Sequence, residues 1–278
     1  MAMQLLVPLQ TYPDGNLPAL ARHVTNLAKH LGSAIHVLVL NADFPLIGNP
    51  LANYVIDANG LIEDAKAQCR LRGDILLKEM REAAEQDGIL ATYTQAEYYP
   101  AALNALIVTQ SRYHDMTLVG LNGNDLTLRA SAEEVLFGSG RPVVLIPEDR
   151  DPADLSHVAV AWDGSRVAAR AVADALLLLH RAAKVTLLCV SDEKTLPDGD
   201  IGQMLVDYLA KHDIAATFLQ IRPGNRPICE TLQLHAIAGG AGLLVMGGFG
   251  HGRMRDFVLG GATTGVLADL RMPVLMSH

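Results

Sequence analysis

The chain has 278 residues, of which 50% are hydrophobic and 19% charged, and its net charge is −8 at pH 7. This composition is typical of a packed globular protein and excludes a disordered chain, and the length is enough for two domains. The negative charge argues against non-specific DNA binding, which needs a basic surface. The chain has no apolar run of the roughly 20 residues that span a bilayer, and no basic signal segment at its start. We therefore expect a cytoplasmic protein that binds neither nucleic acid nor membrane.

The predicted elements alternate between apolar strands and helices along the chain. In residues 1–150 the expected strands are 5–10, 34–43, 89–95, 118–123 and 141–147, with a long helix over 57–88. In residues 151–278 the expected strands are 157–162, 184–190, 214–221, 242–247 and 273–277, with helices within 165–182, 200–212, 226–238 and 257–270. The strands are nearly continuous apolar runs, as expected for buried parallel strands covered on both faces. The order predicts a doubly wound α/β fold.

The two halves are internal repeats of each other. "ILATYTQ" (89–95) matches "IAATFLQ" (214–220) at four of seven positions, and "LVGLNG" (118–123) matches "VMGGFG" (245–250). "RPVVLIP" (141–147) matches "MPVLMS" (272–277) in the same order along the chain. We therefore predict two tandem domains, residues 1–150 and 151–278, each with a five-stranded parallel sheet. The segment 147–156, rich in Pro and Asp, is the expected linker.

The segment 247–264 gathers six glycines and carries the spacing G-x-x-G-x9-G at Gly247, Gly250 and Gly260. Glycine backbone can approach a polyanion closely, and backbone N–H groups at such a loop can hold phosphate oxygens. A tight structural turn is the alternative. The segment follows an expected strand, so it lies at the carboxyl edge of the sheet, where α/β sheets bind their ligands.

On these motifs the chain resembles a tandem member of the universal stress protein family. The family's ATP-binding branch carries G-x-x-G-x9-G followed by Ser or Thr, and an acid after the first strand, which is Asp163 in "VAWDGS". The resemblance implies that Asp163 accepts a hydrogen bond from the adenine amino group. It further implies that Ala161 and Val190 line the base pocket and that Met246 and Gly247 lie against the ribose. The implied phosphate donors are Gly250, Gly260, Gly261, Ala262 and Thr263. His251, which follows Gly250 directly, is a further candidate donor.

The chain departs from the family pattern at Gly261, where the Ser or Thr after the third glycine is expected. The missing hydroxyl leaves the choice among ATP, ADP and AMP open, with or without Mg²⁺, and Thr263 is a candidate to compensate. Two of these residues also have a purely structural interpretation. His251 could be an exposed loop residue, and Asp163 could be the N-cap of the following helix. The histidines are scattered and the cysteines isolated, so we predict no metal site and no disulfide.

The first half retains less of the motif. Gly120 and Gly123 keep G-x-x-G, but Arg129 aligns opposite Gly260, and Gln10 rather than Asp14 is the preferred counterpart of Asp163. We therefore predict one competent site, in residues 151–278, and a degenerate pocket in residues 1–150. The family pairs through its final strands, which implies an internal pairing of the two halves with or without further dimerisation.

Three functions remain open from the sequence. The first is a stress-response protein in which adenine-nucleotide binding regulates stability or partner choice. The second is an interaction or scaffold protein that has lost the nucleotide, and the third is an adenine-nucleotide-dependent enzyme of another α/β class. The chain shows no nucleophile elbow and no HExxH motif, so we expect at most slow ATP hydrolysis.

Overall fold

The computed structural model describes residues 2–48, 57–123, 125–190, 200–248 and 261–278. These residues form one sheet with the strand order β3-β2-β1-β4-β5-β10-β9-β6-β7-β8. The strands of residues 1–150 are β1 (Gln4–Gln10), β2 (Ala34–Ala42), β3 (Ala91–Tyr98), β4 (Met116–Leu121) and β5 (Val143–Pro147). Those of residues 151–278 are β6 (His157–Ala161), β7 (Lys184–Val190), β8 (Ala216–Ile221), β9 (Leu243–Gly247) and β10 (Val274–Ser277). Within each half all pairs are parallel, which confirms the predicted α/β fold.

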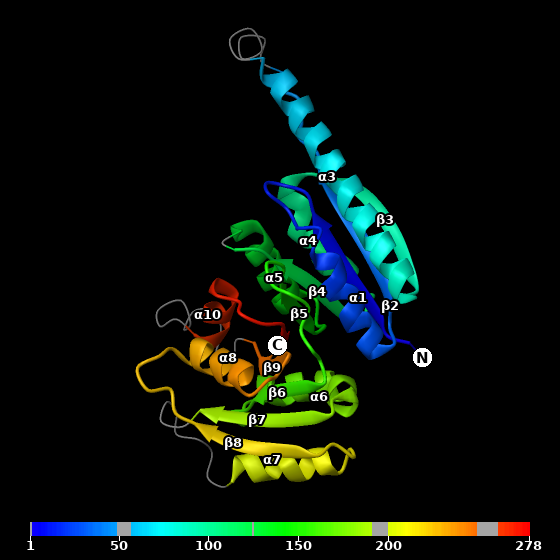
Figure 1. The fold of residues 1–278 in the computed structure, drawn as a ribbon. Coiled ribbons are helices and arrows are strands. Elements are labelled where there is room, and N and C mark those ends of the chain that lie inside the picture. Colours follow the sequence, from blue (N-terminus) through cyan, green and yellow to red (C-terminus); the bar gives the residue numbers. More distant parts are fainter. Residues whose placement is uncertain (1, 49–56, 124, 191–199, 249–260) are drawn as a thin grey trace.

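Helices cover both faces of the sheet (Figure 1). One face packs against α1 (Leu20–Leu31), α3 (Ala58–Asp87), α6 (Arg166–Arg181) and α7 (Ile201–Ala210). The other packs against α4 (Leu103–Ser111), α5 (Leu126–Gly138), α8 (Ile228–Ala238) and α10 (Ala262–Ala268), and a short 3-10 helix, η1 (Pro100–Ala102), precedes α4. The central strands supply alternate apolar side chains to both cores, which explains why they read as continuous apolar runs.

The two halves join through their last strands. β5 and β10 pair antiparallel, with Val144 opposite Leu275, and both side chains are at most 1% exposed. This pairing confirms the predicted internal pseudo-dimer. It also removes two strand edges that would otherwise be free to pair with another chain.

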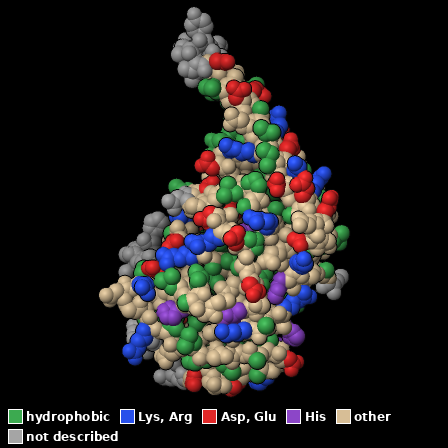
Figure 2. Space-filling view, in the orientation of Figure 1, with side chains coloured by type: hydrophobic (Ala, Val, Ile, Leu, Met, Phe, Trp, Pro, Cys, Tyr) green, Lys and Arg blue, Asp and Glu red, His purple; other side chains and the backbone are tan. Residues whose placement is uncertain are grey.

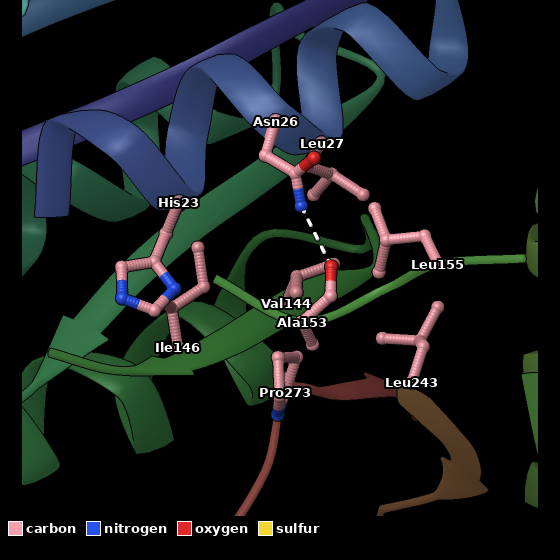
Figure 3. A pocket seen from close by; sticks show the side chains of 9 residues that line it. All are labelled: His23, Asn26, Leu27, Val144, Ile146, Ala153, Leu155, Leu243 and Pro273. Atoms are coloured by element: carbon pink, nitrogen blue, oxygen red, sulfur yellow. Dashed lines mark hydrogen bonds between the residues drawn. The ribbon is translucent and has the colours of Figure 1, made fainter. Parts of the chain in front are cut away.

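A small apolar cavity lies at the seam between the halves (Figure 3). Side chains from α1, β5 and the segment 148–156 meet Leu243 and Pro273 there. Asn26 crosses the seam and donates a hydrogen bond from Nδ2 to the carbonyl oxygen of Ala153 at 2.8 Å. Nearby, Arg181 donates from Nη1 to the carbonyl oxygen of His30 at 2.6 Å. The seam is therefore closed by both apolar packing and directed hydrogen bonds.

The helix α3 is 30 residues long, and its amino end extends beyond the sheet (Figure 1). It begins after Asp57, whose side chain accepts a hydrogen bond from the backbone N–H of Gly60, and it ends at Asp87, followed by the C-cap Gly88 with a φ of 67°. On the face drawn in Figure 2, acidic and basic side chains are interspersed. Of the helices within the described ranges, none combines the length and apolarity needed to cross a bilayer.

Candidate functional site

The strand order places a topological switch point in each half. In residues 151–278, β6 pairs with β7 on one side and with β9 on the other. The chain leaves β6 for α6 on one face of the sheet and leaves β9 for α10 on the opposite face. Helices on opposite faces after neighbouring parallel strands define a switch point, and open α/β sheets bind their ligands beyond the carboxyl ends of the strands at such a point.

The sequence "WDGS" forms a tight turn between β6 and α6. The Oδ1 atom of Asp163 accepts a hydrogen bond from the backbone N–H of Ser165 at 3.0 Å. Gly164 has a φ of 72°, a conformation that favours glycine. Ser165 is the N-cap of α6, and its hydroxyl accepts a hydrogen bond from the N–H of Ala168 at 3.2 Å. Ser165, not Asp163, is therefore the residue that caps the helix, while Asp163 stabilises the turn before it.

Asp163 lies near the carboxyl end of β7, because the backbone N–H of Trp162, the residue before it, donates to the carbonyl oxygen of Leu188 at 2.9 Å. Burial raises the pKa of the Cys189 thiol, and the negative charge of Asp163 raises it further. Ala161 pairs with Leu188, and Val190 is the last residue of β7; both are half-buried. Trp162 donates from its indole N–H to the carbonyl oxygen of Ile201 at 3.0 Å, so its ring packs towards α7. The structure thus brings Ala161, Asp163 and Val190 to one edge.

Gly247 brings the end of β9 against the first turn of α6. A Cβ atom on Gly247 would lie 2.6 Å from the backbone N of Ala168 and from the carbonyl carbon of Val167. Contacts this short are not tolerated by a real Cβ atom, so the close approach requires glycine. The start of the glycine motif therefore touches the helix whose preceding turn contains Asp163, and the neighbouring Met246 is buried at 4% exposure.

The start of α10 supplies the remaining described residues of the predicted phosphate side. Gly261 is the N-cap of α10, and Ala262 and Thr263 form its first turn. α10 runs back towards the amino end of β10, so it begins nearer the carboxyl edge of the sheet. The Thr263 side chain is 6% exposed, whereas Thr264 is exposed. Gly250, His251 and Gly260 lie outside the described residues.

The corresponding edge of the first half is covered by the chain's own side chains. Leu5 pairs with Met116 as Val158 pairs with Leu243, and this register aligns Gln10 with Asp163. Gln10 is 1% exposed. Beside it, Arg72 of α3 donates from Nη1 to the carbonyl oxygens of Thr11 and Pro13, at 3.1 and 2.5 Å.

Two further contacts of the first half involve residues flanking this edge. The rings of Tyr12 and Phe44 meet edge to face, with centroids 4.8 Å apart. Arg129 donates from Nη2 to the carbonyl oxygen of Ala268, at the end of α10, at 3.3 Å. Arg129, which stands where the motif has its third glycine, thus joins the two halves.

Glu148 is the residue of this region that sequence reasoning missed. It lies in the segment interpreted as a linker, yet it is 1% exposed and accepts hydrogen bonds from both loops of the first switch point. A Glu in a stretch rich in Pro and Asp gives no signal of burial. The nearest hint is Asn122 inside the G-x-x-G of the first half, a polar residue directly after a buried strand.

Comparison with known proteins assigns the second half to a family. Residues 155–278 match the model of the universal stress protein family. No curated protein sequence matches the chain.

Solved structures match over nearly the whole chain. A universal stress protein from Archaeoglobus fulgidus DSM 4304 is 18% identical, with a TM-score of 0.69, over 99% of this chain and 96% of its own. A putative universal stress protein from Pseudomonas aeruginosa UCBPP-PA14 is 14% identical, with a TM-score of 0.56, over 99% and 93%. The cytoplasmic domain of a prokaryotic cation chloride cotransporter is 10% identical, with a TM-score of 0.51, over 99% and 95%. At these identities the likeness concerns the fold, which proteins of different function share. Residues 155–278 thus form a universal stress protein domain, and over its full length the chain has the fold of solved universal stress proteins of similar size.

Proposed function

We propose that residues 151–278 bind one adenine nucleotide in the crevice between β6 and β9. The observation that carries this proposal is the contact of Gly247 with the first turn of α6, which brings the start of the glycine motif beside the turn that contains Asp163. The Asp163 carboxylate, proposed to bind the adenine, and the glycine segment, proposed to bind the phosphates, thus flank one switch point, where α/β sheets bind ligands.

The geometry supports a division of the site into two sides. Ala161, Asp163 and Val190, at the ends of β6 and β7, would hold the adenine, with the Asp163 carboxylate accepting from its amino group. Met246 and Gly247 would lie against the ribose. The phosphates would lie towards Gly261, Ala262 and Thr263, and the predicted donors Gly250, His251 and Gly260 belong to the same side.

We propose that occupancy, rather than turnover, is the function, so that the bound nucleotide regulates the protein's stability or its partners in a stress response. Nothing in the sequence motif is dedicated to a chemical step, and the site residues are suited to binding. Gly261 and the burial of Thr263 favour a competing hypothesis, in which the chain is an interaction protein without nucleotide. These two hypotheses differ in whether the purified protein binds ATP at all.

The test is calorimetric titration of nucleotide-free protein with ATP, ADP and AMP, repeated with D163A and S165A. We expect a stoichiometry near one for the wild type and loss of binding in D163A. S165A is the matched control, because it weakens the same turn and the cap of α6 but keeps the Asp163 carboxylate. Two sites would contradict the assignment of a single site to residues 151–278. Equal loss in both variants would mean that the turn, and not the carboxylate, is required, and no heat with any nucleotide would favour the interaction protein.

A further inference from the structure

A carboxylate is buried at the switch point of the first half. Glu148 follows β5 directly, and its backbone N–H donates to the carbonyl oxygen of Leu121 at 3.0 Å, at the end of β4. Its side chain turns inward and the residue is 1% exposed. The chain leaves β1 for α1 on one face and leaves β4 for α5 on the other. The carboxylate therefore lies in the crevice where this half of the fold would bind a ligand.

Three donors from two different loops converge on the Glu148 carboxylate. Asn16 donates from Nδ2 to Oε1 at 2.5 Å, and the backbone N–H of Leu17 donates to Oε2 at 2.8 Å. Asn122 donates from Nδ2 to Oε2 at 3.2 Å. Asn16 and Leu17 lie between β1 and α1, and Asn122 follows β4. Each of the three donors is an amide group, so the site recognises the oxygens of an anion without a salt bridge.

The surrounding backbone is built to hold these donors in place. Asn16 accepts from the backbone N–H of Gln10 at 2.7 Å, and its own N–H donates to the Gln10 carbonyl oxygen at 2.9 Å. Asn122 also donates to the carbonyl oxygen of Gly15 at 2.7 Å. A Cβ atom on Gly120 would collide with Oε1 of Glu148. The first glycine of the retained G-x-x-G thus leaves room for a carboxylate of the chain itself.

We propose that Glu148 is an internal ligand of the first half, and that Asn16, Leu17 and Asn122 form a carboxylate-binding site that it fills. The site would accept a small free carboxylate, such as acetate or formate, once the Glu148 side chain is removed. In the intact chain the bound side chain ties the start of the interdomain segment to both loops of the switch point. This proposal does not depend on nucleotide binding by the second half.

An open groove lies at the surface beside this segment. It is lined by Ala19, Arg22 and residues 148–151. Its charged side chains carry both signs, because Arg22 and Arg150 stand beside Asp149 and Asp151. Because Glu148 lines this groove, we expect removal of its side chain to open the three amide donors towards the groove.

The test is the thermal unfolding of E148A titrated with sodium acetate or sodium formate, against sodium chloride at equal ionic strength and mildly alkaline pH. D149A is the matched control, since it removes an exposed carboxylate at the next position. We expect both carboxylates to raise the Tm of E148A, or to restore its folding if it is unfolded without them, in a saturable manner. Wild type and D149A should not respond. An effect of equal size in all three proteins would be a general salt effect and would overturn the proposal, as would the lack of any response in folded E148A.

A second variant keeps the proposal testable if E148A does not fold under any condition. E148Q preserves the volume of the side chain but replaces one acceptor oxygen by an amide nitrogen. The proton resonances of the Leu17 backbone N–H and of the Asn122 side-chain amide should then shift upfield, because they lose a charged acceptor. D149N should leave both resonances unchanged. Unchanged resonances in E148Q would show that the carboxylate is not the ligand of these donors.

Discussion

The ionisation of Glu148 should make the stability of the protein fall as the pH rises towards neutrality. Burial raises the pKa of Glu148 to about 7, from an ordinary value of 4.5, although hydrogen bonds from Asn16, Leu17 and Asn122 favour the ionised form and lower it. The negative charge of Asp125 adds to the rise. A pKa difference of one between the folded and unfolded states corresponds to about 1.4 kcal/mol. The ionisation of Glu148 should therefore change the free energy of unfolding by about 3 kcal/mol between acidic and neutral pH.

The direction of this dependence follows from the protons bound by each state. Below pH 4.5 the carboxyl group is protonated in both the folded and the unfolded protein, and its contribution to the free energy of unfolding is at its maximum. Between pH 4.5 and about 7 the unfolded chain ionises while the folded protein keeps its proton, so the free energy of unfolding decreases. Above about pH 7 both states are ionised and the contribution no longer changes. Burial lowers the pKa of His23 and His157, and these groups act oppositely, with stability lost as the pH falls.

A difference measurement isolates Glu148 from the histidines. The free energy of unfolding is obtained from urea denaturation of wild type, E148Q and D149N between about pH 4 and about pH 8. The stability of the wild type relative to E148Q should decrease by about 3 kcal/mol across this range, with most of the change between pH 4.5 and 7. D149N should follow the wild type. A wild-type minus E148Q difference that is constant with pH would refute the assignment of a raised pKa to this carboxyl group.

Three stability predictions follow from other contacts. L275A removes a fully buried side chain at the junction of the halves and should cost about 2–5 kcal/mol in urea denaturation. G247A places a Cβ atom 2.6 Å from the backbone of α6 and should lower the free energy of unfolding by about 1–3 kcal/mol. G224A is the comparison variant: Gly224 has open space around it, so this substitution introduces only the strain of a positive φ. S165A removes the cap of α6 and should cost about 1 kcal/mol by thermal unfolding, and no loss of stability would contradict the capping role.

The parts of the fold that repeat in the sequence could be predicted, because apolar periodicity and strand order are local signals. The pairing of β5 with β10 was predictable from the resemblance, and the strand register supports Gln10 as the counterpart of Asp163. The burial of Glu148 was not predictable. It depends on amides that lie more than 130 residues away for Asn16 and Leu17, and no local pattern encodes such a contact. The sequence also left open which residue of "WDGS" caps α6. The structure shows that Ser165 caps the helix and that Asp163 stabilises the turn before it, which depends on the local backbone geometry.

Gly120 and Gly247 are the first glycines of the G-x-x-G motif in the two halves, and each allows a different close contact. The two glycines occupy equivalent positions, within β4 and at the end of β9, and at both a Cβ atom would collide with neighbouring atoms. At Gly247 the nearest neighbours belong to the first turn of α6, whereas at Gly120 the nearest neighbour is the Glu148 carboxylate. A glycine retained in the first half therefore does not by itself indicate a retained nucleotide site. The same argument applies to any duplicated chain of this fold: the atom nearest to the missing Cβ, rather than the glycine itself, shows which part of the protein the close approach accommodates.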